Sequence, residues 1–299
     1  MTPPFRRRRH PASSADAEAT RDHSDGRNTS AAQARRPSRR AVLGGLLLGT
    51  AAAGAAAGTV AELLTETKTA RSFRARFPAH GLVTNEYAYH HPHDPQAHTS
   101  PDWSVTSGSL FARDGDGWTG PPDVGNTGPD SARHTDSAIF RLVTHRRDFG
   151  AVKVRTSVCP APPVITQRTP AKDWDGGHIW LRYHGPQELY ALSFRRRDGL
   201  VVIKRKIPAK DASTVDGGDY ATVAQRRHTF PYRTWHRVTA GAVNTSSGTV
   251  LLRLDIDGQT VLAAEDRTPG PLLTPGGVGL RADNTELLFR DFTALVPRS

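Results

Sequence analysis

Cysteine is nearly absent from this chain, because Cys159 is the only one among 299 residues. A single cysteine excludes an intramolecular disulfide and a zinc site built from cysteines. Sustained helical periodicity is also lacking in the C-terminal three quarters, and no glycine-rich phosphate loop or serine-hydrolase elbow occurs there. These absences argue against a disulfide framework, a helical bundle and a nucleotide-binding domain.

The first 61 residues have the composition of a targeting leader. Residues 1–37 contain one aromatic, Phe5, among Arg, Ala, Ser, Asp and Pro, so we expect them to be disordered. Residues 38–61 open with Ser38-Arg39-Arg40 and continue as uncharged Leu, Gly, Ala and Thr, an order that resembles a twin-arginine signal. We therefore expect export, with the signal cleaved and the protein secreted, or with the apolar segment kept as a membrane anchor.

This leader also explains most of the net charge. Residues 1–61 hold ten arginines and four acidic residues, and so contribute six of the formal charge of +11. The rest of the chain has 30 basic and 25 acidic residues. So small an excess gives little reason to expect a nucleic-acid partner.

After a polar connector over residues 62–79, residues 80–299 show the pattern of one all-β domain. Short alternating or apolar runs are separated by Gly, Pro, Asp and Asn. Asp198-Gly199 and Asp257-Gly258 lie between extended runs and predict hairpin turns. We predict strands over 82–89, 103–111, 137–144, 149–158, 178–184, 188–195, 200–206, 235–243, 249–256, 259–264, 277–282 and 285–296. So many short strands predict a β-sandwich or barrel.

Three segments in this order resemble the concanavalin A-like jelly-roll superfamily, especially its laminin-G-like and 3-keto-disaccharide hydrolase-like domains in secreted bacterial proteins. They are Phe149–Val154, Gly177–Tyr183 and the end from Gly277 to Asn284 with Phe289–Phe292. The resemblance implies a jelly-roll β-sandwich of two antiparallel sheets, whose concave sheet often carries a carbohydrate site. It implies a ligand class but no particular activity.

The run from His178 to His184 alternates between polar or aromatic and apolar residues. In a strand, His178, Trp180 and Arg182 would share one face while Ile179, Leu181 and Tyr183 share the other. An aromatic ring beside cationic groups suits sugar stacking with carboxylate recognition. We therefore predict a polysaccharide or oligosaccharide site that includes Trp180 and Arg182. The alternative is an ordinary solvent-facing strand.

Further along, Lys204 and Lys206 would share a face, and they would form a cationic patch beside the Trp180 strand if the two strands are neighbours. Such a patch would suit uronic or sulfated sugars. Lys206 is also explained as a charged strand edge that resists aggregation. We include Lys204 among the predicted substrate-binding residues.

The same residues allow an enzyme as an alternative to a binding protein. A polysaccharide lyase needs a base, an acid and a cation, which His178, Tyr190 and Arg182 or Lys204 would supply. A retaining glycoside hydrolase needs two carboxyl groups close together, and no Glu-x-Asp-x-x-Glu strand motif occurs. A third alternative is a non-catalytic adhesion module that contacts protein. Under each alternative we expect a monomer.

A structural Ca²⁺ ion is the one cofactor that the resemblance suggests. Its ligands would be acidic residues near the two ends of the domain, here Glu86 and Asp291. The acidic loop Asp173–Gly176 and the histidine-rich segment 89–98 are further metal candidates, although loops of these compositions are also common on solvated surfaces.

Overall fold

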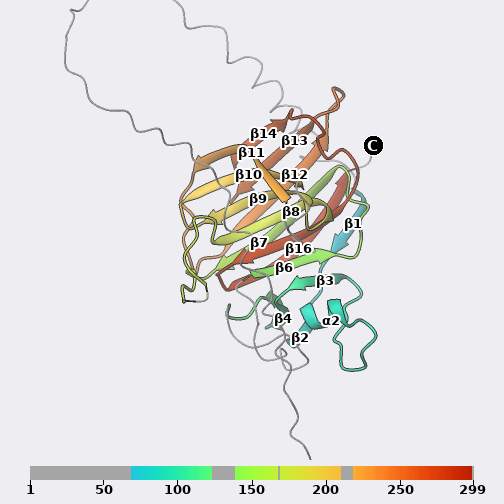
Figure 1. Cartoon of the computed structure of the whole chain (residues 1–299), viewed down its shortest axis with the longest axis vertical. Helices are drawn as coiled ribbons and strands as arrows, with labels where there is room; N and C mark the ends of the chain where they lie inside the picture. The colour runs from blue at the N-terminus through green and yellow to red at the C-terminus, as the bar shows by residue number, and fades with distance from the viewer. Residues whose placement is uncertain (1–68, 123–138, 168, 210–217, 298–299) are drawn as a thin grey trace, which may run out of the picture.

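The computed structural model describes residues 69–122, 139–167, 169–209 and 218–297. These residues form two antiparallel sheets that stack face to face (Figure 1). The predicted disordered leader and twin-arginine signal lie outside the described residues. Within the described part, no helix has the length and apolar character needed to cross a membrane.

The nine-stranded sheet contains both ends of the described chain. Its first strand, β1, pairs with β16, to one side of the main strand order. The strands in order are β14 (Gln259–Asp266), β13 (Val250–Ile256), β12 (His236–Asn244), β7 (Val152–Pro160), β16 (Leu287–Pro297), β5 (Asp116–Trp118), β4 (Ser109–Arg113) and β2 (His80–Asn85), together with β1 (Thr69–Arg74).

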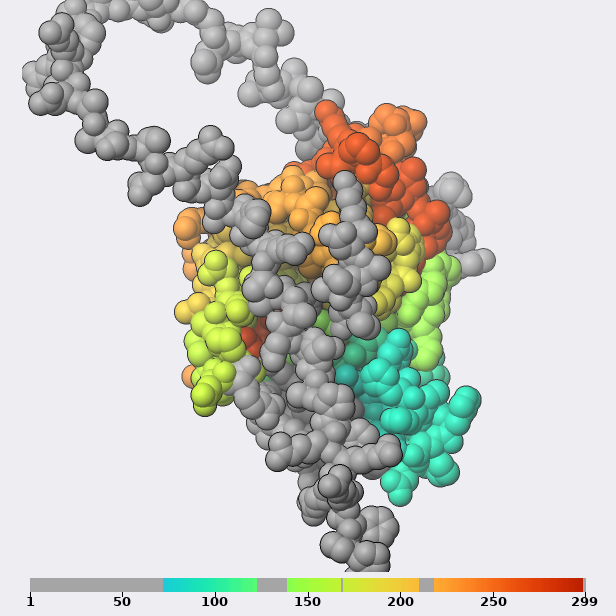
Figure 2. Space-filling view, in the orientation of Figure 1, coloured from blue at the N-terminus to red at the C-terminus, as the bar shows by residue number. Residues whose placement is uncertain are grey.

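The seven-stranded sheet covers the inner face of the nine-stranded one. Its strands in order are β11 (Gly218–Arg227), β10 (Leu200–Pro208), β9 (Glu188–Arg196), β8 (Gly176–Gly185), β15 (Gly277–Asp283), β6 (Ile139–Thr144) and β3 (Trp103–Ser107). The segment with β2, β4 and the short helix α2 (Glu86–His90) projects as a lobe at one end of the molecule (Figure 2).

One apolar core lies between the sheets, and strand alternation explains it. In β13, Val250, Leu252 and Leu254 are buried while the residues between them are partly exposed. Successive side chains of a strand point to opposite faces, so the apolar ones enter the core together. The resulting architecture is the jelly-roll β-sandwich of two antiparallel sheets that the sequence predicts.

Two predicted strands differ from the structure. The strand expected over 82–89 ends at Asn85, whose side chain accepts a hydrogen bond of 2.9 Å from Ala88 N and caps α2. The strand expected over 103–111 is two strands in different sheets, because the chain turns at Gly108, which has a φ of 81°. Local composition does not reveal that the chain changes sheet there.

Three strands were missed by the sequence reasoning. β1 lies within the range predicted as a connector and contributes Phe73 to the core. β5 is only three residues long. β11 is an edge strand with few apolar residues, so its alternation signal is weak. This last omission matters because β11 carries Tyr220.

The two Asp-Gly turns are confirmed. Gly199 has a φ of 77° between β9 and β10, and Asp257 and Gly258 have φ values of 51° and 83° between β13 and β14. In the Asp257-Gly258 turn, positive φ at both central residues matches the twist of a two-residue hairpin, whereas in the first turn only Gly199 has a positive φ.

Candidate functional site

The predicted site strand, β8, divides its side chains between the two faces of the seven-stranded sheet. Ile179 and Leu181 enter the main core. Trp180 belongs to a separate apolar cluster, in which its ring stacks on Tyr183 at 5.4 Å with an interplanar angle of 13°. His178 and Trp180 therefore lie on the outer face, as the alternation predicts.

The alternation fails at Arg182 and Tyr183. Arg182 does not share a face with Trp180, and Tyr183, predicted to lie with Ile179 and Leu181, packs in the Trp180 cluster instead. Arg182 has a φ of 50°, and the β8–β9 register shifts after Leu181. This bulge turns Arg182 toward the carbonyl oxygens of Leu272 and Gly150. Burial of the guanidinium lowers its pKa to about 10. Arg182 thus fixes two loops from within the protein.

Tyr190 lies on the same inner side. Its hydroxyl donates to Asp266 at 2.7 Å and accepts from Leu272 N at 3.1 Å. Burial, followed by the hydrogen bond to Asp266, raises the pKa of Tyr190. The structure therefore does not bring Tyr190 and Arg182 together with His178, although all three are near one another in sequence.

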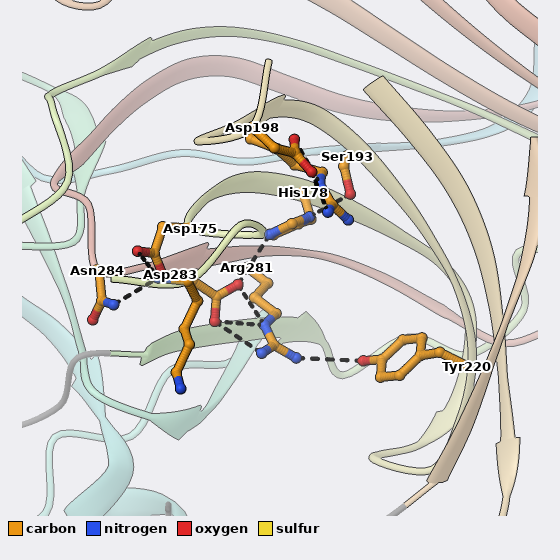
Figure 3. Close-up of polar contacts among 10 residues, drawn as sticks. Asp175, His178, Ser193, Asp198, Tyr220, Arg281, Asp283 and Asn284 are labelled. Atoms are coloured by element: carbon orange, nitrogen blue, oxygen red, sulfur yellow. Dashed lines mark hydrogen bonds and ion pairs between the residues drawn. The ribbon is translucent and has the colours of Figure 1, made fainter. Parts of the chain in front are cut away.

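On the outer face, His178 is the centre of a hydrogen-bonded network (Figure 3). Its Nδ1 lies 2.7 Å from Ser193 Oγ, and its Nε2 lies 2.9 Å from Asp283 Oδ2. Arg281 holds the same carboxylate through contacts of 2.8 Å from both Nε and a terminal nitrogen. Four side chains from three adjacent strands are thereby fixed relative to one another.

The charge states in this network follow from burial and pairing. Burial lowers the pKa of His178 and favours the neutral imidazole. Burial alone would raise the pKa of Asp283, but Arg281 and His178 reverse this effect and keep its pKa well below the ordinary range. The pair is therefore a neutral imidazole beside an ionised carboxylate.

Ser193, His178 and Asp283 have the residue types of a nucleophilic triad, but their burial decides otherwise. Ser193 is 3 % exposed, and both ring nitrogens of His178 have partners. A nucleophile must reach a substrate atom. The network instead holds the Arg281 guanidinium in one orientation.

Arg281 connects this network to Tyr220 across the sheet. Its NH1 lies 3.4 Å from the Tyr220 hydroxyl, and the two side chains point toward one another in Figure 3. Their strands, β15 and β11, are separated by β8, β9 and β10. Four inter-strand steps would span about 19 Å in a flat sheet. The contact therefore requires the sheet to curve toward this side, which we call the concave face.

Tyr220 is the accessible aromatic residue of the concave face. It is 37 % exposed, whereas Trp180 is 3 % exposed. The ammonium groups of Lys204 and Lys206 lie 5.7 and 5.0 Å from its ring centroid. The phenol is thus in contact with three cationic side chains, counting Arg281. Sequence reasoning missed Tyr220 with its strand, and it missed Arg281-x-Asp283 because those residues were used only to identify the fold.

Lys204 and Trp180 lie at the same level across the sheet, on strands that are separated by β9. Both are paired opposite Ala191 of β9, Lys204 from one side and Trp180 from the other. Directly opposite residues share a face, so a methyl group is the only side chain between the cation and the indole at this level. The condition for a lysine patch directly beside the Trp180 strand is therefore not met, because β9 lies between the two strands.

The metal candidates do not assemble a calcium site. Glu86 accepts a hydrogen bond from Gly108 N at 3.1 Å, while Asp291 is exposed and lies 4.0 Å from Arg74. Asp175, in the acidic loop, accepts from Lys172 N and from the Asn284 amide at 2.8 and 2.9 Å. No cluster of three or more His, Cys, Asp or Glu suited to a metal occurs within the described residues.

Comparison with known proteins gives likeness of fold only. No family model matches the sequence, and no curated protein matches it. The carbohydrate binding module CBM66 from Bacillus subtilis is 10 % identical, with a TM-score of 0.45 over 65 % of this chain and 95 % of that one. A Bacillus subtilis protein of unknown function with a galectin-like fold is 15 % identical, with a TM-score of 0.45 over 78 % and 100 %. The marine PL-14 alginate lyase from Aplysia kurodai is 12 % identical, with a TM-score of 0.42 over 77 % and 100 %.

Proposed function

We propose that this protein recognises carbohydrate, and that its concave face binds an acidic polysaccharide. The observation that carries the proposal is the partly exposed Tyr220 ring beside the partly exposed Lys204, with the buried cations Lys206 and Arg281 behind the ring adding positive charge. An aromatic face stacks on the apolar face of a sugar ring, and the cations complement carboxylate or sulfate groups.

The network behind Arg281 supports this proposal. A guanidinium that is already oriented loses less side-chain entropy when it binds an anion. Asp283 and His178 provide that orientation from a buried position. Trp180, predicted as a substrate contact, lies deeper on the same face beyond Ala191, is 3 % exposed and stacks on Tyr183, so we assign it to the support of this surface.

A binding experiment on the full chain tests the proposal. Polygalacturonate, alginate and a sulfated glucan are compared with neutral glucans at low and high salt. We expect the acidic polymers to bind more tightly and their affinity to fall with added salt, because exposed charges are screened. Tyr220→Ala should weaken binding by about tenfold, corresponding to ~1.4 kcal/mol of lost stacking and cation contact.

Tyr89→Ala is the matched control, since Tyr89 is an exposed tyrosine at 50 % on α2. Binding should be unchanged in this variant. If neutral and acidic polymers bind alike, or if both tyrosine variants lose affinity equally, the concave-face proposal is wrong.

A second candidate function is elimination on the same polymer. The favouring observation is a phenol within 3.4 Å of a guanidinium and near two ammonium groups, which together offer a proton-transfer group and neutralisers of a uronate carboxylate. Tyr220 replaces Tyr190 in this scheme, because Tyr190 lies on the inner side. Release of unsaturated uronates, lost in Tyr220→Phe while binding is retained, would establish the lyase over the simple binder.

The export route belongs to the proposal as well. We propose that the segment with Arg39 and Arg40 directs the folded domain out of the cell, where extracellular polysaccharide is available. Replacing both arginines with lysine should retain the protein in the cytoplasm, as fractionation of an expressing bacterium would measure. Export of the Lys-Lys variant at the original level would exclude the twin-arginine route.

A further inference from the structure

The outer face of the nine-stranded sheet contains a pocket that the proposed function does not use. It has a volume of about 300 Å³ and is lined by Ser157, Trp235, His236, Arg237 and Asp257. We call it the Trp235 pocket. It is built on β7, on the start of β12 and on the turn between β13 and β14. None of its residues belongs to the concave face.

Two arginines flank the floor of this pocket. Ser157 of β7 is paired opposite Arg237 of β12 on one side and opposite Arg290 of β16 on the other. Directly opposite residues share a face with Cβ atoms about 4.5–5.5 Å apart. A small hydroxyl therefore lies between two exposed guanidinium side chains, an arrangement that suits an anionic group.

Trp235 provides an aromatic wall over this row. The Arg290 guanidinium lies 4.2 Å from the centroid of its ring. Trp235 precedes β12 and Arg290 is on β16, so the contact reaches over β7, the strand between them. A cation held on one face of the indole limits the movement of the ring.

His236 and Asp257 close the pocket on the hairpin side. Asp257 accepts from His236 Nδ1 at 2.7 Å and from Arg237 N at 2.9 Å. The His236 ring packs on Phe230 at 4.1 Å between centroids. His236 is paired opposite the core residue Val158, whereas Arg237 is opposite Ser157, so the His236 ring lies on the inner face of the sheet and its buried Nε2 is not open to the pocket. Through Nδ1 it holds the Asp257 carboxylate at the pocket rim.

We propose that the Trp235 pocket is a second ligand site, which takes one sugar residue carrying a carboxylate. Arg237 and Arg290 bind the carboxylate, Trp235 contacts the sugar ring, and Ser157 and Asp257 bind hydroxyl groups, with Asp257 held in place by His236. Recognition requires both the hydroxyl groups of the sugar and its carboxylate. The inference is independent of the proposed function, because the two sites share no residue.

The test follows tryptophan side-chain resonances of the full chain during titration. The chain has five tryptophans, and loss of one indole signal in Trp235→Phe assigns the pocket resonance. Glucuronate is the probe, with glucose and inorganic sulfate as parallel arms. We expect glucuronate to shift the Trp235 resonance with much higher affinity than either parallel probe.

The variants Arg237→Gln and Arg290→Gln should each weaken glucuronate binding by about tenfold, as expected for a lost charge-assisted hydrogen bond. Arg155→Gln is the matched control, because Arg155 is also exposed on β7 but is paired opposite Thr239 and Thr293, away from the pocket. It should bind as the wild type does.

Three outcomes would overturn the proposal. One is a Trp235 resonance that glucuronate leaves unmoved, and another is equal weakening by all three arginine variants. The third is an equal response to sulfate, which would mean binding of a simple anion. Tyr220→Ala should leave the glucuronate titration unchanged. Loss of glucuronate binding to the Trp235 pocket can therefore be distinguished from loss of polysaccharide binding to the concave face.

Discussion

The two outer faces of the sandwich use charge in different ways. On the concave face, His178, Asp283 and Arg281 are buried and connected in one network. On the nine-stranded face, ion pairs such as that of Arg253 with Asp255, at 2.6 Å, join residues two apart on one strand. Arg281 and Asp283 are also two apart on one strand, but that pair is buried and is joined to His178 of the neighbouring strand, whereas Arg253 and Asp255 are partly exposed.

The difference indicates that charged side chains on the concave face are held in one orientation before any ligand binds. A buried ion pair carries a large desolvation cost and is stable only if all its members are paired. Such an arrangement on an outer sheet surface orients Arg281 at the site we propose for acidic polysaccharide. The Trp235 pocket on the nine-stranded face is formed instead by partly exposed and exposed side chains of neighbouring strands and of one turn.

The variant Asp283→Asn tests the difference between the two faces most directly. The substitution leaves Arg281 and His178 buried without their anion, and should lower the free energy of unfolding by ~3–5 kcal/mol in urea denaturation. Asp255→Asn, the counterpart on the nine-stranded face, should cost about 1 kcal/mol or less. If both variants lower the free energy of unfolding by a similar amount, the concave-face network contributes no more to stability than the pair on the other face.

Tyr190→Phe tests whether the inner side of the seven-stranded sheet contributes to stability but not to binding on the concave face. It leaves the Asp266 carboxylate and Leu272 N without their hydroxyl partner, at a cost of about 1–3 kcal/mol in thermal or urea unfolding. Binding of acidic polysaccharide should not change at temperatures where the variant is folded. Lost affinity with unchanged stability would instead place Tyr190 at the ligand.

The pH dependence of stability gives a smaller effect. His178 has a pKa lowered from 6.5 in the folded protein, so the unfolded chain binds more protons, and stability should fall as the pH drops below about 6.5. One such group changes stability by at most ~1.4 kcal/mol per pH unit. Asp283, with its lowered pKa, adds a further loss once the pH falls through the ordinary aspartate range near 3.8.

Urea midpoints at pH 7 and 5.5 measure the first of these steps. His178→Gln should reduce the difference between the two midpoints, whereas His80→Gln, at an exposed histidine of β2, should not. An unchanged difference in His178→Gln would mean that other groups cause the loss.

Lys204 is the one predicted site residue that contacts Tyr220, and the other predictions differ from the structure for identifiable reasons. Alternation correctly placed His178 and Trp180 on the outer face. It failed at Arg182 because a bulge depends on pairing with both neighbouring strands. It missed Tyr220 because an edge strand needs few apolar residues and so leaves little pattern in the sequence.

The sequence by itself determined the all-β class, the inward apolar faces and the Asp-Gly hairpins, because side-chain alternation and positive φ are local properties. Only the tertiary structure decided which charged residues meet. Arg281 and Tyr220 are 61 residues apart and four strands apart, and the curvature of the whole sheet brings them into contact. The same holds for the Arg237, Ser157 and Arg290 row, whose members come from three strands joined by pairing alone.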